Sequence, residues 1–298
     1  MTEREGFVEW GGSRTWFRVV GDLGSGLDPL VCLHGGPGST HHYFTPLERL
    51  AEGGRPVVLY DQLGCGSSDR PHAIDWGVQV FLDELAALRA QLGLDRIHLL
   101  GTSWGGMLAL EHALSAFAEG DFGGLTSLVL SSTLASADEW VAEATRLRGE
   151  LPPEVIAVLD EHERAGTYDS PEYAAAEAVL NARHFFRGPS NPPELERMLP
   201  ERGAESYRAM WGPNEWTLTG ALRGWDVRSR LPELDLPVLV IRGRYDLSTE
   251  SIAATLVRGL PQAREVVFEE SSHTPVLEET ERYLEVVGDF LREAEGGS

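Results

Sequence analysis

The segment Gly101–Gly105, which reads G-x-S-x-G, constrains the fold of this chain more than any other feature. The apolar run Arg96–Leu100 precedes it and is typical of a buried strand, and Met107–Leu114 follows with the composition of a helix. A serine on a tight strand-to-helix turn is held with its hydroxyl exposed at the end of a sheet, and small neighbours let the turn close. The motif alone is common by chance and could be a simple glycine-rich turn. Its flanking strand and helix predict that Ser103 is a nucleophile.

Apolar runs alternate with helical patterns along most of the chain. Between Val78 and Leu92 the apolar residues recur at helical spacing, and Gly93 follows as a candidate C-cap. An antiparallel hairpin is expected at the start, from Phe7–Trp10 and Thr15–Val20. Continuous apolar strands separated by helices predict an α/β fold with a mostly parallel central sheet and helices on both faces. The expected strands of this sheet are Leu30–Leu33, Pro56–Tyr60, Arg96–Leu100, Leu125–Leu130, Pro237–Gly243 and Arg264–Phe268, and a closing helix is expected over Val276–Leu291.

The pattern changes between about Leu134 and Gly224. This stretch is rich in Ala, Glu and Arg, is interrupted by several prolines, and contains no convincing strand. We therefore expect an α/β-hydrolase core made of residues 1–133 and 225–298, with an inserted helical cap at 134–224. A helical linker between two independent domains is the weaker alternative, because the two strands after the insertion are too few to form a stable domain alone.

The charge balance excludes several classes of partner. The 298 residues include 25 basic and 47 acidic side chains, for a net charge of −22, whereas nucleic acids and anionic membranes both require a basic surface. Met1–Gly6 is charged with no apolar run behind it, and no stretch approaches the roughly 20 apolar residues that span a bilayer. With only Cys32 and Cys65, the chain has no disulfide framework. We expect a cytoplasmic protein with no nucleic-acid or membrane partner, and the sequence leaves its oligomeric state open.

Two further residues complete a candidate catalytic triad. A serine hydroxyl needs a base to take its proton, and the base needs a third group to hold its tautomer. In this fold the order along the chain is serine, then acid, then histidine. Asp246 and His273 each follow the end of a predicted strand, at the edge where α/β sheets place ligands. Of nine histidines only His273 has this position, so the predicted triad is Ser103, Asp246 and His273.

A second glycine-rich segment, His34–Ser39, follows the strand at Leu30. Its glycines allow a backbone N–H to approach a substrate carbonyl, and we predict that the N–H groups of Gly36 and Trp104 form the oxyanion hole. A third segment, Asp61–Asp69, is expected to be a rigid loop at the same edge without a catalytic role. Cys65 within it has no histidine partner evident by position, so we expect a structural cysteine.

No cofactor is expected. No group of His, Cys and Asp residues has the spacing of metal ligands, and a serine triad requires neither a metal nor an organic cofactor.

Taken together, these motifs resemble those of the proline iminopeptidase family of α/β-hydrolases. The resemblance runs from the first strand to the last helix, and H-G-G-P-G and D-Q-x-G-x-G-x-S are much more specific than G-x-S-x-G. The family removes N-terminal residues, often proline, from small peptides and includes amino-acid amidases. The resemblance therefore implies a serine hydrolase that cleaves an amide next to a free amine through an acyl-enzyme, on a small-molecule or short-peptide substrate. The segments that carry it are His34–Gly38, Asp61–Asp69, Gly101–Gly106, Gly243–Asp246 and the stretch around His273.

The segment Trp211–Trp216 resembles a cap segment that binds the substrate amine in the tricorn-interacting aminopeptidase branch of the family. The resemblance assigns Glu215 to that amine, and Trp211 and Trp216 on either side offer aromatic faces that attract a cation. The alternative is that Asn214 and Glu215 simply begin a helix, where an acid is favoured.

One departure from that branch keeps other substrates open. There, a second amine-binding acid follows the catalytic aspartate, whereas here Asp246 is followed by Leu247. An esterase, a lactonase or a tailoring hydrolase of secondary metabolism on the same scaffold is therefore the alternative function. A non-catalytic binding protein is a third possibility, disfavoured by the intact triad and oxyanion loop. Fold and triad do not separate the first two, because specificity lies in the cap.

Overall fold

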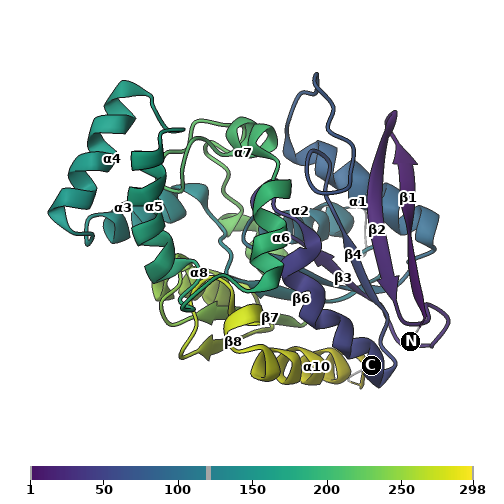
Figure 1. Ribbon diagram of the computed structural model, residues 1–298. Helices are drawn as coiled ribbons and strands as arrows, with labels where there is room; N and C mark the ends of the chain where they lie inside the picture. The colour runs from purple at the N-terminus through teal and green to yellow at the C-terminus, as the bar shows by residue number, and fades with distance from the viewer. Residues whose placement is uncertain (1, 119–121, 297–298) are drawn as a thin grey trace.

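The computed structural model describes residues 2–118 and 122–296 of the chain, which form an eight-stranded sheet with the order β1-β2-β4-β3-β5-β6-β7-β8 (Figure 1). The first two strands make the expected antiparallel hairpin, and β2 also pairs antiparallel with β4. All other neighbours in the sheet are parallel. The strands are β1 (Glu3–Trp10), β2 (Ser13–Val20), β3 (Leu30–Leu33), β4 (Val57–Tyr60), β5 (Ile97–Thr102), β6 (Leu125–Ser131), β7 (Val238–Gly243) and β8 (Ala263–Phe268).

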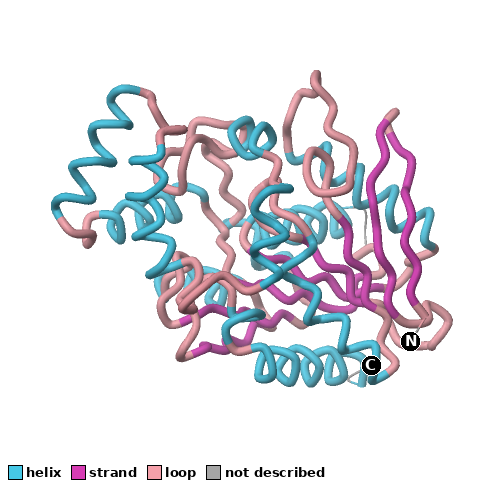
Figure 2. Tube along the Cα trace, in the orientation of Figure 1, coloured by secondary structure: helices cyan, strands magenta, loops and turns pink. Residues whose placement is uncertain are grey.

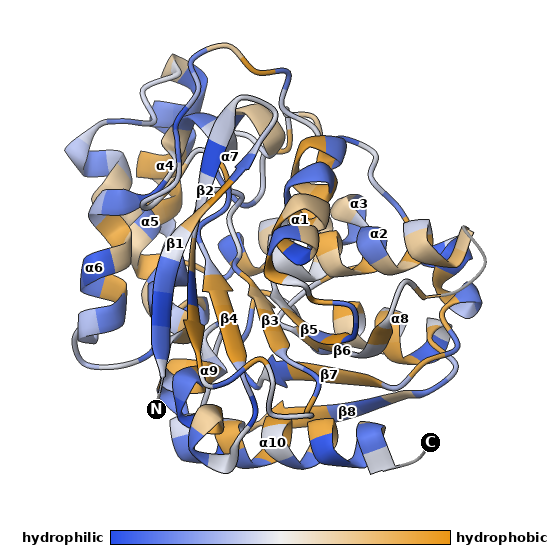
Figure 3. Cartoon of the chain, turned by 90° about the vertical axis from the view of Figure 1, so that its right-hand side faces the viewer, coloured by the Kyte–Doolittle hydropathy of each residue, from blue (hydrophilic) through white to orange (hydrophobic). Residues whose placement is uncertain are grey.

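Helices cover both faces of this sheet, as the continuous apolar strands predict. Successive residues of a strand point to opposite faces. In β3, Val31 and Leu33 pack into one apolar cluster while Leu30 and Cys32 pack into the other. Figure 3 shows the strands coloured mainly as hydrophobic between the two helical layers. One layer contains α1 (Val78–Leu92), α2 (Trp104–Ala118) and α8 (Glu250–Gly259), and the other contains the 3₁₀ helix η1 (His41–Gly53) and α10 (Thr280–Gly296).

Helix α1 has the bounds that the sequence predicts. Its apolar residues Phe81, Leu85 and Leu88 are fully buried. Gly93 ends the helix in a left-handed conformation with φ of 68°, and its N–H bonds back to the last turn. In the described part of the chain, no helix combines the length and the apolar character that a bilayer span requires.

The last expected helix is divided in two. The sequence predicts one helix over Val276–Leu291, but the structure has α9 (Pro275–Glu278) and α10, separated at Glu279. Glu279 has a non-helical φ of −131°, and its carboxylate accepts a hydrogen bond of 2.6 Å from the hydroxyl of Ser271. The break therefore follows from a bond between this side chain and the loop after β8, which periodicity cannot reveal.

Residues 134–224, called here the helical segment, lie between β6 and β7 and leave the sheet as helices and loops (Figure 2). The stretches of chain that enter and leave the helical segment lie side by side. The Val227 N–H donates to the Ala135 carbonyl at 2.9 Å, and the Ala137 N–H donates to the Trp225 carbonyl at 2.9 Å. A short 3₁₀ helix, η2 (Arg228–Glu233), then leads back to β7. The helices of the segment are α3 (Ala137–Arg148), α4 (Pro153–Ala165), α5 (Pro171–His184), α6 (Pro193–Glu201) and α7 (Ala204–Met210).

Candidate active site

Ser103 stands on a sharp turn between β5 and α2. Its φ of 55° lies in the left-handed region, which a serine adopts only where its surroundings hold it there. The Ser103 N–H donates to the carbonyl of Ser131 at 3.1 Å, and its own carbonyl accepts from the N–H of Gly106 at 2.9 Å. A Cβ at Gly105 would collide with the carbonyl oxygen of Leu33, so glycine lets α2 begin directly against β3. The second glycine of the motif is thus required by packing.

Asp246 and His273 come together beyond the ends of β7 and β8. The Asp246 Oδ1 lies 2.7 Å from His273 Nδ1, and the two residues are only 4% and 5% exposed. The loops that carry them are joined by a bond of 3.1 Å from the Tyr245 N–H to the Ser271 carbonyl. Because Nδ1 faces the carboxylate, Nε2 is the nitrogen left to accept a proton from a hydroxyl.

The charges around His273 favour its protonated form. Burial alone disfavours an imidazolium, but the Asp246 carboxylate and its hydrogen bond outweigh burial, and Glu215 adds to them. Together they raise the pKa of His273 above the ordinary 6.5. A histidine with a raised pKa accepts a proton from an attacking hydroxyl more readily.

A chain of hydrogen bonds connects the serine turn to the acid. The Thr133 hydroxyl donates to the Ser103 carbonyl at 2.6 Å, and the Ser248 hydroxyl donates to the Thr133 carbonyl at 2.7 Å. The Ser248 N–H in turn donates to Asp246 Oδ1 at 2.9 Å, the same oxygen that faces His273. Sequence analysis missed Thr133 and Ser248, whose only signal was their place just after β6 and just after Asp246.

The H-G-G-P-G loop lies against the serine. A Cβ built on Gly35 would be 3.1 Å from the Cβ of Ser103, so Gly36 follows at the rim of the same site. The Gly35 N–H donates to the hydroxyl of the buried Tyr43 at 2.6 Å, which holds the loop from η1. Trp104 is the first residue of α2, where helical N–H groups have no partner within the helix.

The loop after β4 has more contacts than the sequence predicts. Its Asp61 carboxylate accepts from the N–H of His41 at 2.9 Å and from that of Ser67 at 2.9 Å. Cys65 does have a histidine neighbour, contrary to the sequence expectation, because its Sγ lies 3.4 Å from the Nε2 of His34. Burial raises the pKa of the Cys65 thiol well above its usual value, so the thiol stays protonated and inert.

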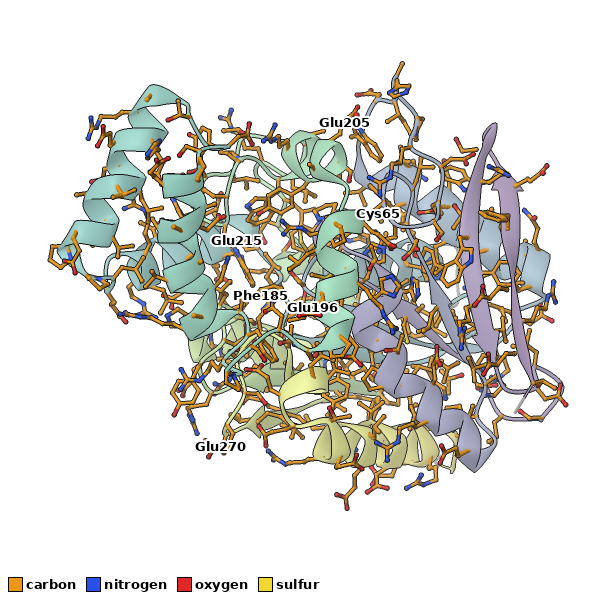
Figure 4. The ribbon with its side chains drawn as sticks, in the orientation of Figure 1. Cys65, Phe185, Glu196, Glu205, Glu215 and Glu270 are labelled. Atoms are coloured by element: carbon orange, nitrogen blue, oxygen red, sulfur yellow. The ribbon has the colours of Figure 1, made fainter. Side chains whose placement is uncertain are left out.

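Glu215 lies in the helical segment near His273, and Figure 4 shows it with Phe185 between α5 and α6. Its Oε2 accepts from the indole Nε1 of Trp140 at 3.1 Å, and its Oε1 accepts from the Tyr207 hydroxyl at 2.7 Å. The Trp140 ring in turn meets the His273 ring edge-on, with centroids 5.7 Å apart. Trp140 therefore stands between the carboxylate and the histidine, a contact that no local motif announces.

The two tryptophans beside Glu215 in sequence have other partners. Trp211 donates to the Asn214 carbonyl at 3.0 Å and meets Trp140 edge-on at 6.4 Å. Trp216 donates to the Glu163 carboxylate at 2.8 Å, and Arg148 covers its ring at 5.5 Å. Trp211 thus borders the aromatic group around the site, whereas the face of Trp216 already holds a cation from the protein itself.

A second acid of the helical segment, Glu177, lies in the field of Glu215. Burial, and then the Glu215 carboxylate, raise the pKa of Glu177 to about 7, and Arg202 opposes them. On helix α5, Glu177 lies one turn after Tyr173 and two turns before His184. The Tyr173 hydroxyl accepts from the side-chain amide of Asn214 at 2.7 Å. The His184 carbonyl accepts from the His273 N–H at 3.2 Å. Helix α5 therefore spans the distance between Asn214, the neighbour of Glu215, and His273.

Comparisons with known proteins identify the family of this chain. The α/β hydrolase fold family matches residues 28–280. A proline iminopeptidase of Clostridium botulinum is 41% identical over 294 residues, 98% of this chain and 99% of that protein. The crystal structure of VinJ has a TM-score of 0.93 at 42% identity, covering 98% of this chain and 99% of that one. The crystal structure of proline iminopeptidase from Mycobacterium smegmatis has a TM-score of 0.88 at 38% identity, with 99% of each chain covered. The chain belongs to the proline iminopeptidase family of α/β hydrolases. It is therefore a hydrolase.

Within this family, position 247 distinguishes the chain from the branch with an acid after the catalytic aspartate. Leu247 is only 2% exposed and packs in the apolar cluster that contains Trp140 and Trp211. Its side chain fills space beneath the helical segment, and the neighbouring Ser248 supplies the bond to Asp246.

A histidine and two acids meet far from this site. The side chains of Asp28, His98 and Glu295 have ligand atoms within 4.8 Å of one another, a grouping that spacing in the sequence does not suggest. Two arginines already pair with these acids: the Arg55 guanidinium donates to both Glu295 oxygens at 2.9 and 2.7 Å, and Arg96 lies 3.1 Å from Asp28. Burial, and then Arg55, lower the pKa of His98 to about 4. The group ties α10 to the opposite edge of the sheet.

Proposed function

We propose that this member of the proline iminopeptidase family is a serine aminopeptidase or amino-acid amidase. It would remove an N-terminal residue that carries a free amine from a short peptide or small amide. The observation that carries this proposal is the Glu215 carboxylate, which accepts hydrogen bonds from Tyr207 and from Trp140, the residue whose ring meets that of His273. A fixed negative charge close to the catalytic base suits a substrate whose ammonium group is adjacent to the scissile carbonyl. The relatives named proline iminopeptidase favour proline as the residue removed.

The reaction would proceed through an acyl-enzyme. His273 takes the proton of Ser103 through Nε2 as the serine oxygen attacks the carbonyl carbon, and Asp246 stabilises the imidazolium that forms. The N–H groups of Gly36 and Trp104 bind the negative oxygen of the tetrahedral intermediate. His273 then gives its proton to the departing amine, the acyl group stays on Ser103, and water activated by the same histidine releases the amino acid.

The helical segment would act as a cap over this site, on a core of residues 1–133 and 225–298. Two contacts support this role: the His184 carbonyl accepts from the His273 N–H at 3.2 Å, and the Phe185 ring lies 5.4 Å from the imidazole. With Trp140 these residues surround the base with groups from the segment. Substrate selection would therefore depend on residues 134–224.

A second candidate, an esterase or lactonase for less polar substrates, is favoured by the buried Leu247 in place of an acid. A panel of aminoacyl-naphthylamides with free and acetylated amines, assayed alongside simple esters, distinguishes the two. The aminopeptidase proposal expects the highest kcat/KM on the free amines. Equal or better turnover of acetylated amides and plain esters would overturn it in favour of the second candidate.

A further inference from the structure

The loop after β4 contains a buried carboxamide that touches both sides of the proposed oxyanion hole. Gln62 has no exposed surface, and neither does His34, while Trp104 is 1% exposed. The Gln62 Nε2 donates to the His34 carbonyl at 2.8 Å, and the Gln62 Oε1 accepts from the Trp104 indole Nε1 at 2.8 Å. His34 directly precedes Gly35 and Gly36, and Trp104 directly follows Ser103.

The orientation of this carboxamide is determined by its partners. An indole N–H can only donate and a backbone carbonyl can only accept, so the oxygen of Gln62 must face Trp104 and its NH₂ must face His34. The Gln62 backbone N–H also donates to the Nε2 of His34 at 2.9 Å, which requires Nδ1 to carry the proton and donate to the Gly35 carbonyl at 3.0 Å. Burial lowers the pKa of His34 to about 4, so this neutral tautomer persists across the working pH range.

The two sides that Gln62 joins follow paired strands, with Leu33 of β3 opposite Gly101 of β5, and each side has a further support of its own. The loop at Gly35 is fixed to η1 through the Tyr43 hydroxyl, and the serine turn is fixed to β6 through Ser131 and Thr133. Gln62 follows β4 and reaches across the end of β3 to Trp104, the first residue of α2 after β5, since the sheet order is β4-β3-β5. Its two side-chain bonds therefore relate the position of one candidate donor to that of the other.

We propose that Gln62 is a positioning residue that sets the relative placement of the Gly36 and Trp104 N–H donors. This inference rests on the oxyanion hole of the proposed function. Removing a whole donor typically costs about 10²–10³ in kcat, and sites lose efficiency when groups move by about half an ångström. A displaced pair of donors should therefore lower kcat by about 10- to 100-fold while ground-state binding changes little.

The test replaces Gln62 by methionine, which has a similar length and no hydrogen-bonding amide. Activity is measured on p-nitrophenyl butyrate, whose turnover needs Ser103 and the oxyanion hole but no amine anchor, so a wrong substrate assignment leaves the test intact. We expect Gln62→Met to lower kcat about 10- to 100-fold and to change KM less than about threefold. The affinity for a small alkylboronic acid, which forms a tetrahedral adduct with the serine, should fall by a factor similar to that of kcat. Ser127→Ala is the matched control. Ser127 is fully buried, and its hydroxyl lies 2.7 Å from His98 at the opposite edge of the sheet.

Two results would overturn the inference. One is a Gln62→Met enzyme with kcat within threefold of wild type, and the other is an equal loss of kcat in Ser127→Ala at a similar fall in Tm. Either would mean that the carboxamide only stabilises the fold.

Gln62→Glu keeps the inference testable if the methionine variant does not fold. When protonated, the introduced carboxyl group can still donate to the His34 carbonyl and accept from Trp104. When ionised, it presents an oxygen to that carbonyl and repels it. The ratio of variant to wild-type kcat should therefore fall as pH rises through the pKa of the introduced group, which burial raises. A ratio independent of pH would contradict a positioning role.

Discussion

Replacing Glu215 by glutamine removes one charge from the proposed amine site and nearly nothing else. Glutamine keeps an oxygen that can accept from the Trp140 indole, now 3.1 Å from the carboxylate, and its NH₂ can donate to the Tyr207 hydroxyl, now 2.7 Å away. Both contacts can persist with Tyr207 reversing its role. We therefore expect the free energy of unfolding to change by less than about 1 kcal/mol.

The loss on a charged substrate should be much larger. An ammonium about 4 Å from a carboxylate at an effective dielectric constant near 20 gains about 4 kcal/mol, and truncating one partner of such a pair typically costs about 2–5 kcal/mol. At about 1.4 kcal/mol per tenfold, Glu215→Gln should lower kcat/KM for a prolyl-naphthylamide by roughly 30- to 4000-fold. An uncharged ester should lose less than about threefold, because Ser103 and His273 are unchanged.

The assay compares kcat/KM on the two substrates at pH 8 for wild type, Glu215→Gln and Glu111→Gln. Glu111 is the matched control, because its carboxylate also accepts from an indole, that of Trp225 at 2.6 Å, on helix α2. Glu111→Gln should leave both substrates within about threefold of wild type. Equal losses on both substrates in Glu215→Gln would refute the reasoning and give Glu215 a structural role. No loss on either would remove the amine anchor from the proposal.

Four further predictions concern the same site. Ser103→Ala should leave a folded protein with no measurable turnover, by circular dichroism and esterase assay, and wild-type rates in that variant would end its role as nucleophile. The acid limb of the pH profile of kcat/KM should lie above pH 6.5, because His273 must be neutral to act and its pKa is raised. Asp246→Asn should lower kcat about 10⁴-fold, and a fully active variant would mean that another acid holds the histidine. Binding of the amino-acid product near pH 7 should release a proton, because the ammonium group lowers the pKa of Glu177 from about 7. Titration calorimetry in two buffers of different ionisation enthalpy measures this proton release. Equal binding heats in the two buffers would contradict the prediction.

The part of the fold that depends on local pattern could be predicted closely. Helix α1 begins at Val78 and ends at Leu92, as the apolar spacing and Gly93 indicate, because a stripe of buried residues and a left-handed cap are both encoded within a few positions. The break at Glu279 could not be predicted, since its carboxylate bonds to Ser271 in the loop after β8, a contact that the helical spacing of residues does not encode.

The candidate site divides in the same way. Asp246 and His273 could be paired in advance, because parallel strands bring their carboxyl ends to one edge and the structure sets the two side chains 2.7 Å apart. Trp140 and Tyr207 could not, because they reach Glu215 from two different helices of the helical segment. The importance of Gln62 was equally hidden, since the sequence shows its loop but not the two buried partners that its carboxamide joins.

The packing of Leu247 explains why the negative charge near His273 comes from the helical segment. In the branch of the family that the sequence resembles, a second acid stands next to the catalytic aspartate, but here Leu247 is buried in the apolar cluster below the helical segment. An ionised carboxylate in that apolar place would lose its hydration without a partner, which is costly. Glu177 instead lies within reach of Glu215 from helix α5, and its pKa of about 7 means that it can carry its charge when a cation is present and lose it when none is. Under the proposed function, the helical segment would supply both acids, and the core would supply the serine, the histidine and the aspartate. A change of substrate would therefore require changes in α5 and around Glu215, with the serine turn left as it is.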